Sequence, residues 1–389
     1  MTQSQRKPGA TAAAAGVFAG LVCWSFYGSV AAGQSEAGLE RSQQHDFRSV
    51  TLADGLDHPW GLAFLPEGGI LITERSGALR LFSGGKLQPA PVKGSPRVAA
   101  SGQGGLLDVA LHPDFAENRL VYLSYAGEAD GKAGTEVARG RFDGTSLSGL
   151  EVIFRAQPKT PGRAHYGSRL VFDRAGRLYI SLGDRRNYLQ EAQNPANHIG
   201  SIVRLNDDGS LPADNPFIGE TGKRPEIYSY GHRNVQGMTL RPGSDEIWAH
   251  EHGPRGGDEL NLIKPGANYG WPAITYGIDY SGAVISDKTA APGMEQPVVY
   301  WDPSIAPSGM AFYEGDRFPA WQGDLFIGAL AHRHLRRLEM EGSEVVGQEE
   351  LLRDLGQRIR DVAAGPDGFL YVLTDSSDGR LIRLEPVAP

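Results

Sequence analysis

One short pattern recurs six times along the chain. Each copy consists of an apolar strand, a turn built from residues such as Pro, Asp and Gly, and a second strand of alternating polarity. The apolar strands begin near the following residues: Gly61, Val109, Leu170, Met238, Met310 and Val362. The copies are spaced roughly 45 to 70 residues apart, which is enough for four antiparallel strands of about five or six residues with their turns. The repeat therefore predicts six similar small sheets.

These sheets indicate an all-β fold, a six-bladed β-propeller of four-stranded antiparallel blades. Period-2 patterning and the scarcity of long helical stripes support an all-β chain. A β-sandwich is the structural alternative, but it does not account for six similar units. We expect the ring to close by pairing a strand near Arg48–Leu52 with the last blade, which ends at Arg380–Leu384. Closure removes a sheet edge that could otherwise pair with another chain.

The N-terminus has the layout of a secretory signal peptide. Arg6 and Lys7 precede a small and apolar run that ends near Val30, and Ser29-Val30-Ala31 resembles a small-x-small cleavage site. A retained N-terminal anchor is the alternative, because the apolar run approaches spanning length. We expect a secreted or periplasmic protein, or one held at the membrane through its N-terminus. The chain then divides into a signal peptide or anchor, a flexible linker and a propeller domain: residues 1–33, 34–46 and 47–389.

Cysteine usage and charge limit what the mature domain can do. Cys23 is the only cysteine and lies in the N-terminal apolar run, where a lipoprotein cysteine is an alternative that the bulky Val22 disfavours. The mature domain then has no disulfide, thiolate metal site or cysteine nucleophile. The net charge of −8 argues against a nucleic-acid partner, because phosphate binding needs a concentrated basic surface. No second apolar stretch is long enough to span a membrane, so we expect no span in the mature domain.

Three long connections between the repeats are rich in Gly, Pro, Asn and His: residues 157–167, 184–225 and 251–304. In a propeller such connections gather on one face around the central channel, where a ligand would bind. Four groups of residues in or near them need a chemical explanation. They are Gly102–Gly105; His165–Gly167 with Gly183–Asn187; Gly231–Gly237; and Glu251–Glu259 continuing to Asn268–Pro272.

Each group is weak evidence when taken alone. His165 could be an ordinary hydrogen-bonded loop residue, and Arg233-Asn234 could be a turn salt bridge. The Gly-rich acidic loop around Asp258 and Glu259 is more specific, since carboxylates and exposed carbonyls suit a hard cation, calcium above all. The sequence shows no HExxH zinc motif, GxSxG elbow, Walker loop or dinucleotide fingerprint. Zinc enzymes, serine hydrolases, phosphoryl transfer and NAD chemistry are therefore disfavoured.

In their order and residues, these segments resemble those of the soluble PQQ-dependent aldose sugar dehydrogenases, the glucose/sorbosone dehydrogenase family. The resemblance runs from about Leu56 to Leu384, and it is most specific over Gly231–Gly237 and His252–Pro272. It implies a propeller that binds PQQ and calcium and oxidises aldose sugars at C1 to the lactone. The reaction would be a general-base-assisted hydride transfer to the quinone. The partners would be a small sugar and an electron acceptor that the sequence does not identify.

The resemblance also implies the roles of individual residues. His165 matches the base that removes the proton from the anomeric hydroxyl, and Asp184 matches the carboxylate that orients it. Arg233 matches the residue that stabilises negative charge on the quinone oxygen. A neutral-range base oriented by a carboxylate suits this chemistry. The remaining cofactor contacts would be Gln103, Asn234, Arg358 and Arg360. The calcium ligands would be the carbonyls of Gly253 and Pro254 at the quinone, with Glu259 and the Tyr269 carbonyl at a second, structural site.

One departure from the family bears on cofactor affinity. The family often has a lysine where this chain has Ala331, and the residues next to it, His332 and Arg333, are the candidates to supply the charge. The stretch Tyr300–Ser304 could form an aromatic wall over the quinone or pack in the core. Two other functions stay open. One is a calcium-dependent, lactonase-like propeller hydrolase, disfavoured because carboxylates are scarce at the matching points. The other is a non-catalytic binding propeller, favoured if Ala331 marks lost cofactor binding.

Overall fold

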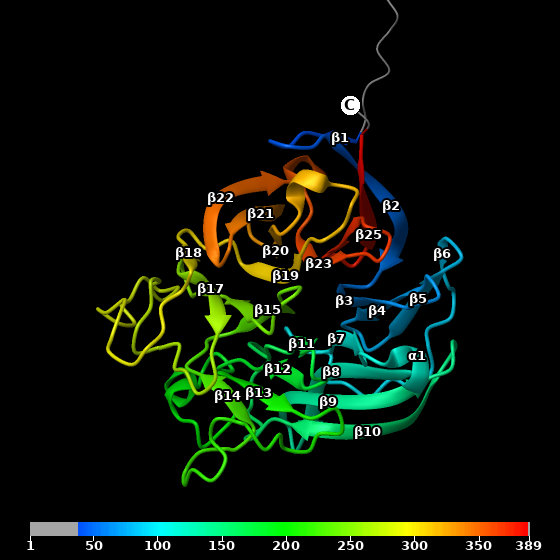
Figure 1. The fold of residues 1–389 in the computed structure, drawn as a ribbon. Coiled ribbons are helices and arrows are strands. Elements are labelled where there is room, and N and C mark those ends of the chain that lie inside the picture. The colour runs from blue at the N-terminus through cyan, green and yellow to red at the C-terminus, as the bar shows by residue number, and fades with distance from the viewer. Residues whose placement is uncertain (1–37, 388–389) are drawn as a thin grey trace, which may run out of the picture. The chain divides into compact units, whose positions relative to one another are not determined.

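The computed structural model describes residues 38–387, and it confirms the predicted six-bladed β-propeller. Six antiparallel sheets stand around a common centre (Figure 1). Five of them have four strands, and the sixth gains a short fifth strand. The predicted signal peptide or anchor at residues 1–33 lies outside the described residues.

Blades 1 to 3 follow one another along the chain. Blade 1 contains β3 (Pro59–Phe64), β4 (Ile70–Glu74), β5 (Leu79–Ser83) and β6 (Lys86–Leu87). Blade 2 contains β7 (Leu106–Leu111), β8 (Leu120–Ala129), β9 (Lys132–Phe142) and β10 (Leu147–Arg155). Blade 3 contains β11 (Leu170–Phe172), β12 (Leu178–Ser181), β13 (Ser201–Leu205) and β14 (Ile227–Tyr230).

Blades 4 to 6 complete the ring. Blade 4 contains β15 (Val235–Leu240), β16 (Ile247–Glu251), β17 (Asp258–Ile263) and β18 (Val299–Trp301). Blade 5 contains β19 (Pro307–Phe312), β20 (Leu325–Ala329), β21 (His334–Glu341) and β22 (Glu344–Leu351). Blade 6 contains β23 (Ile359–Ala364), β24 (Leu370–Thr374), β25 (Gly379–Pro386), β2 (Phe47–Leu56) and β1 (Leu39–Glu40).

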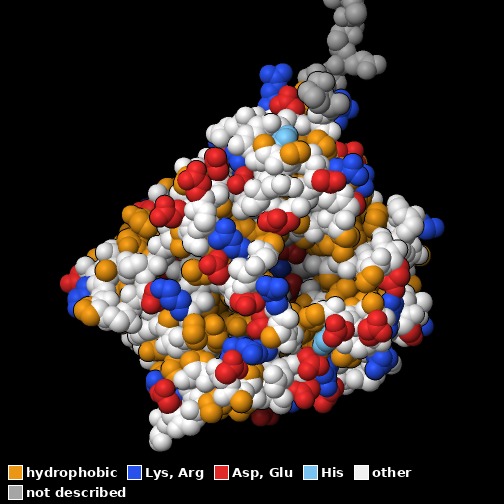
Figure 2. Space-filling model, viewed as in Figure 1, with side chains coloured by type: hydrophobic (Ala, Val, Ile, Leu, Met, Phe, Trp, Pro, Cys, Tyr) orange, Lys and Arg blue, Asp and Glu red, His pale blue; other side chains and the backbone are white. Residues whose placement is uncertain are grey.

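The described helices are short: α1 (Phe115–Asn118) and the 3-10 turns η1 (Leu189–Gln193), η2 (Pro319–Trp321) and η3 (Arg353–Leu355). None of them is long and apolar enough to cross a membrane. Figure 2 shows acidic and basic side chains interspersed over the face in view, which is hollowed between the blades.

The two strands of each sequence repeat are the first two strands of a blade. In β3, β7, β15 and β23 the first four residues are buried, which is the pattern expected of strands with neighbours on both faces. Apolar clusters lie mainly between blades: one joins Leu71 of blade 1 to Val109 of blade 2, and another joins Leu373 of blade 6 to Ile72 of blade 1. Full burial of such a side chain contributes about 1.5–3 kcal/mol. A single blade therefore cannot bury its own apolar faces, and the repeat has to close on itself.

Neighbouring blades are also joined by buried hydroxyl groups at one repeated position of the second strand. Ser124 Oγ donates to the Ser168 carbonyl at 2.6 Å, and Ser181 Oγ donates to the Val235 carbonyl at 3.1 Å. Thr73 Oγ1 makes the equivalent bond to the Leu107 carbonyl. These bonds cross from each of the first three blades to the next.

Blade 6 closes the ring with strands from both ends of the described chain. Residues of β2 pair with β25, for example Arg48 with Glu385 and Thr51 with Ile382, so the predicted closure is confirmed. Part of the segment predicted to be a linker, from Gly38 onward, lies within the described residues. Its strand β1 pairs with β2, and the ring of His45 packs edge-on against Trp321 at 5.4 Å. The polar composition of this segment hid the pairing, because an edge strand needs little apolar surface.

Candidate active site

Three loops bring the predicted catalytic residues together at the start of the inner strands. His165 lies before β11, Asp184 follows β12, and Arg233 precedes β15. The backbone N–H of Asp184 donates to the Arg233 carbonyl at 2.7 Å, and Gly183 forms a bridge with Asn234. The loops of blades 3 and 4 are therefore fixed to each other by main-chain bonds. His165 itself has a φ of 53°, a left-handed conformation that a non-glycine residue rarely adopts.

The His165 imidazole is held by a fully partnered carboxylate. Its Nδ1 lies 2.6 Å from Oδ1 of Asp184, which also accepts the backbone N–H of Arg186 at 2.7 Å. The other oxygen of Asp184 accepts the indole N–H of Trp271 at 2.8 Å. The backbone N–H of His165 donates to Oε1 of Gln103 at 2.7 Å. Because Nδ1 carries the proton toward Asp184, Nε2 is the nitrogen with a free lone pair.

Burial controls the charge of this pair. Burial lowers the pKa of His165, the bond to Asp184 partly offsets that effect, and the positive charge of Arg233 lowers the pKa further. Burial alone would raise the pKa of Asp184, but the bond and charge of His165, together with Arg233, hold it below its ordinary value. The geometry therefore presents a neutral imidazole backed by an ionised carboxylate, which is the state that a general base requires.

Arg233 and Asn234 are both buried beside this pair. Nη1 of Arg233 donates to the carbonyls of His252 and Gly253 at 2.9 and 2.7 Å. Its guanidinium lies 5.3 Å from the ring centre of Trp271 and 6.0 Å from that of the exposed Tyr280. Oδ1 of Asn234 accepts the backbone N–H of Gly167 at 3.2 Å, so the amide is oriented by the His165 loop.

A pocket of about 210 Å³ adjoins these residues at the channel axis. Of the predicted cofactor contacts, Gln103, Asn234, Arg358 and Arg360 line it. His165 and Arg233 do not line it directly, although the residues that follow them, Tyr166 and Asn234, do. The pocket also contains residues that sequence reasoning missed: Trp60, Arg75, Gln236 and Asp375.

Asp375 fixes the two predicted arginines of this pocket. Its Oδ2 accepts Nε of Arg358 at 3.0 Å and Nη2 of Arg360 at 3.2 Å. Burial lowers the pKa of Arg360 to about 10, which leaves it charged at neutral pH. The missed residues differ in whether the sequence offered a signal. Gln236 lies inside the conspicuous Gly231–Gly237 segment, whereas Arg75 and Asp375 are single residues at the ends of ordinary strands.

The residues next to Ala331 that were expected to supply a positive charge to the pocket do not lie in its lining. Ala331 lines the pocket, but His332 and Arg333 are exposed and do not. Nη1 of Arg333 donates to the Gly356 carbonyl at 3.3 Å instead. The additional positive charge in the lining comes from Arg75, on a different blade. The tight turn at Ala331 directs the two following side chains away from the channel, since both His332 and Arg333 have left-handed φ values.

The stretch Tyr300–Ser304 does not wall the pocket. Trp301 packs in the core between blades 4 and 5, where its indole N–H donates to Gln348 at 2.9 Å. Tyr300 is exposed and stacks on Tyr276 at 3.9 Å. The aromatic rings that line the pocket are instead Trp60 and Tyr166. Trp271, which lay within the predicted segment Asn268–Pro272 but had no role assigned to it, contacts Asp184 and not the pocket.

The predicted calcium ligands fall partly together. Gly253, Glu259 and Tyr269 line a cavity of about 10 Å³ with Glu251, whereas Pro254 is not part of that lining. The volume suits one water-sized occupant. Burial and the neighbouring Glu251 raise the pKa of Glu259 to about 8. The described residues contain no cluster of three or more His, Cys, Asp or Glu side chains that could hold a metal. A cation here would therefore rely on the two carboxylates and on backbone carbonyls, which is a calcium-type oxygen set.

Comparisons with known proteins match almost the whole described chain. A family model described as glucose/sorbosone dehydrogenase matches residues 56–383. Aldose sugar dehydrogenase YliI of Escherichia coli is 52% identical over 341 residues, which covers 86% of this chain and 92% of that protein.

Two solved structures extend the comparison. The apo form of the soluble E. coli aldose sugar dehydrogenase has a TM-score of 0.85 at 50% identity, over 88% of this chain and 100% of that one. The PQQ-bound aldose sugar dehydrogenase of Streptomyces coelicolor has a TM-score of 0.73 at 30% identity, over 88% and 98%.

Proposed function

The chain belongs to the glucose/sorbosone dehydrogenase family as a quinoprotein oxidoreductase, and we propose that it oxidises aldose sugars at C1 to the lactone with PQQ and calcium. The observation that carries the proposal is the buried His165–Asp184 pair at 2.6 Å, set beside a pocket lined by arginines. The S. coelicolor relative binds PQQ, which supports the same cofactor here.

The residues of the pocket fit such a cofactor. Arg75, Arg358 and Arg360 provide three guanidinium groups against the single carboxylate of Asp375, so the lining favours an anion. PQQ is planar and carries three carboxylates, and guanidinium groups bind planar anions through paired hydrogen bonds. The ring of Trp60 adds a flat apolar surface to the lining. When bound, the quinone supplies the acceptor for the hydride that leaves C1 of the sugar.

The chain itself performs the proton transfer. Nε2 of His165 would take the proton of the C1 hydroxyl while C1 loses its hydrogen as hydride, so that the sugar as a whole loses two electrons and two hydrogens. Asp184 would stabilise the imidazolium that forms, and Trp271 keeps the carboxylate in line. The guanidinium of Arg233 would stabilise the negative charge that develops on the group accepting the hydride.

Calcium is part of the proposal on separate grounds. The small cavity beside Glu251 and Glu259 would hold one ion with the Tyr269 carbonyl, and a bound cation would remove the repulsion between the two buried carboxylates. A second ion would use the carbonyls of Gly253 and Pro254 next to the quinone. At present the Gly253 carbonyl accepts Nη1 of Arg233, so that ion would share it with the guanidinium.

The proposal also retains a secreted or periplasmic location, which rests on residues 1–33, and an electron acceptor of unidentified chemistry. The alternatives make opposite predictions about cofactor dependence. A lactonase-like hydrolase would open lactones with calcium and no PQQ, and a binding propeller would turn over neither substrate.

Reconstitution tests the proposal directly. The protein is loaded with PQQ and calcium, desalted, and assayed for dye reduction by a panel of aldoses. We expect retained quinone absorbance and aldose-dependent turnover, and we expect H165A to retain PQQ but lose about 10²- to 10⁴-fold in kcat. Absence of both retained quinone and turnover in the wild-type protein would refute the proposal. Unchanged turnover in H165A would remove that residue from its role.

A further inference from the structure

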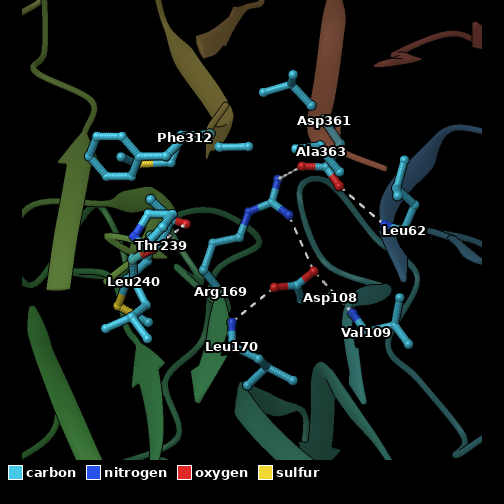
Figure 3. A pocket seen from close by; sticks show the side chains of 16 residues that line it. Leu62, Asp108, Val109, Arg169, Leu170, Thr239, Leu240, Phe312, Asp361 and Ala363 are labelled. Carbon is cyan, nitrogen blue, oxygen red and sulfur yellow. Dashed lines mark hydrogen bonds and ion pairs between the residues drawn. The ribbon is translucent and has the colours of Figure 1, made fainter. Parts of the chain in front are cut away.

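The inner strands of the propeller line two cavities, one at each end of the channel. The cofactor pocket is lined by residues at the starts of these strands, such as Gln236 and Arg360. A second cavity, of about 310 Å³, is lined by residues at their far ends, including Leu240, Phe312 and Ala364. Figure 3 looks into this second cavity and shows the guanidinium of Arg169 at its centre. Arg169 therefore lies where the channel would otherwise run through.

This guanidinium is buried and binds acceptors on three other blades. Arg169 precedes β11 in blade 3, and its side chain is 6% exposed. Nη1 lies 3.2 Å from Oδ1 of Asp108 in blade 2, and Nη2 lies 3.0 Å from Oδ1 of Asp361 in blade 6 (Figure 3). Nε donates to the Gln236 carbonyl in blade 4 at 2.7 Å.

The two carboxylates continue the connection. Oδ2 of Asp108 accepts the backbone N–H of Leu170 in blade 3 at 2.9 Å, and Oδ2 of Asp361 accepts the backbone N–H of Leu62 in blade 1 at 3.1 Å. One side chain and its two partners thus join five of the six blades at the axis. Burial raises the pKa of Asp361 to about 6 even with Arg169 beside it, and the charge of Asp108 adds to that effect.

The other side of Arg169 supports the floor of the cofactor pocket. Its guanidinium lies 4.1 Å from the ring centre of Trp60, and the guanidinium of Arg360 lies 6.0 Å from the same ring. Trp60, Gln236 and Arg360 all line the pocket. Arg169 is not in that lining, so it would act on a bound ligand only through these residues.

Stability alone does not account for such a network. A buried ion pair often contributes little net stability, and well-packed apolar residues can replace it at no loss. Rigid geometry is a better explanation, because a planar guanidinium with five N–H donors fixes several partners at once.

We propose that Arg169 is the positioning residue of the cofactor pocket: it closes the channel and sets the height of the floor made by Trp60 and Gln236. The inference rests on the proposed binding of PQQ. It predicts that substituting Arg169 weakens PQQ binding although every residue that lines the pocket is left unchanged.

The test compares two conservative changes in buried arginines. R169K keeps the charge but loses the planar fork. R204K is the matched control: Arg204 in blade 3 is also buried, its Nε donates to Asn215 at 2.6 Å, and its guanidinium lies 5.0 Å from the Tyr228 ring, away from the channel. PQQ affinity is measured on the full, calcium-loaded chain by quenching of tryptophan fluorescence, beside thermal unfolding of the cofactor-free protein.

We expect R169K to bind PQQ about 10- to 100-fold more weakly, as is typical when a supporting partner of a binding group is changed. R204K should keep wild-type PQQ affinity even where its melting temperature falls. A third variant, D108N with R169M and D361N, removes all three charges together and so leaves no unpaired ion; it should fold and still bind PQQ weakly.

Four outcomes are decisive. Wild-type affinity in R169K, or an equal loss in R204K, would overturn the positioning role while leaving the proposed function intact. Wild-type affinity in the neutral triple variant would also overturn it. A wild-type chain that binds no PQQ would overturn the proposed function, and this inference with it.

Discussion

Burial and nearby cations set the protonation state of His165. Since the imidazole acts as a base only when neutral, activity should fall as pH falls through its pKa, and burial places that pKa below 6.5. Arg186 contributes to the lowering, and its side chain is exposed. We predict that R186Q moves the acid limb of kcat/KM toward higher pH, because losing a positive charge makes the imidazolium easier to form.

The shift should be small and should vanish in high salt, because exposed charges are screened. R163Q is the control: Arg163 is an exposed arginine in the same loop as His165, but it is not among the charges that lower the histidine pKa. Equal acid limbs for R186Q and the wild type at low ionic strength would contradict this assignment.

Glu259 links pH to metal binding. Burial and Glu251 raise its pKa to about 8, so the folded, calcium-free chain favours the protonated acid. In the unfolded chain the pKa of Glu259 returns to about 4.5. The protonated acid therefore contributes its full stabilisation of the folded chain below pH 4.5, and this contribution is lost as pH rises through 8. We predict that E259Q raises the melting temperature of the calcium-free protein at pH 8, and that calcium raises the melting temperature of the wild type by more than that of E259Q.

Differential scanning fluorimetry with calcium or with chelator, at pH 6 and pH 8, measures both effects. E344Q, on the exposed side of β22, controls for the loss of one negative charge. A calcium shift of the same size in E259Q would show that the ion binds elsewhere.

At the scale of single residues, the site could be predicted from short segments rich in Gly, Asn, His and Arg. His165, Asp184 and Arg233 lie in such segments, and the structure brings all three together. Trp60 and Asp375 had no such signal. Each is a single residue in its local segment, and only ring closure brings blades 1 and 6 to the same pocket.

At the scale of strands, buried hydroxyl groups join each of the first three blades to the next one, beside the apolar clusters that lie between blades. Ser124 Oγ donates to the Ser168 carbonyl and accepts the backbone N–H of Asp108, and both bonds are buried. We predict that S124A lowers the free energy of unfolding by about 1–3 kcal/mol, because two buried backbone groups lose their partner. Denaturant unfolding measures the loss; S148A, an exposed serine of the same blade, should change it by under about 0.5 kcal/mol. A loss no larger than that of S148A would show that water replaces the hydroxyl.

Inner strands were easier to predict than outer ones. The six apolar repeats correspond to the first two strands of each blade, because buried strands need continuous apolar residues. The outer strands β6 and β18 have only two and three residues, and β1 has two, so their sequences carry no periodic pattern. Their positions follow from pairing with a neighbour, which a local pattern does not record.

At the scale of the whole molecule, the ring is closed by β2, which comes from the opposite end of the chain to β23, β24 and β25 of the same blade. Phe47 at the start of β2 is fully buried and packs edge-on against Trp321 of blade 5 at 5.6 Å. Closure of this kind could be predicted from the sequence because both closing segments read as strands. The packing of Phe47 could not, since its partners lie more than two hundred residues away in the chain.

We predict that F47A destabilises the protein by about 3–5 kcal/mol, the usual cost of removing a buried phenylalanine. T51A, an exposed change on the same strand, should have an effect of under about 0.5 kcal/mol. Because every blade shares its core with two neighbours, the loss should appear as one cooperative transition at lower denaturant, and PQQ affinity of the folded fraction should stay unchanged. Two separate transitions in F47A would show that blade 6 opens on its own, and that the ring is held by its individual interfaces rather than by closure.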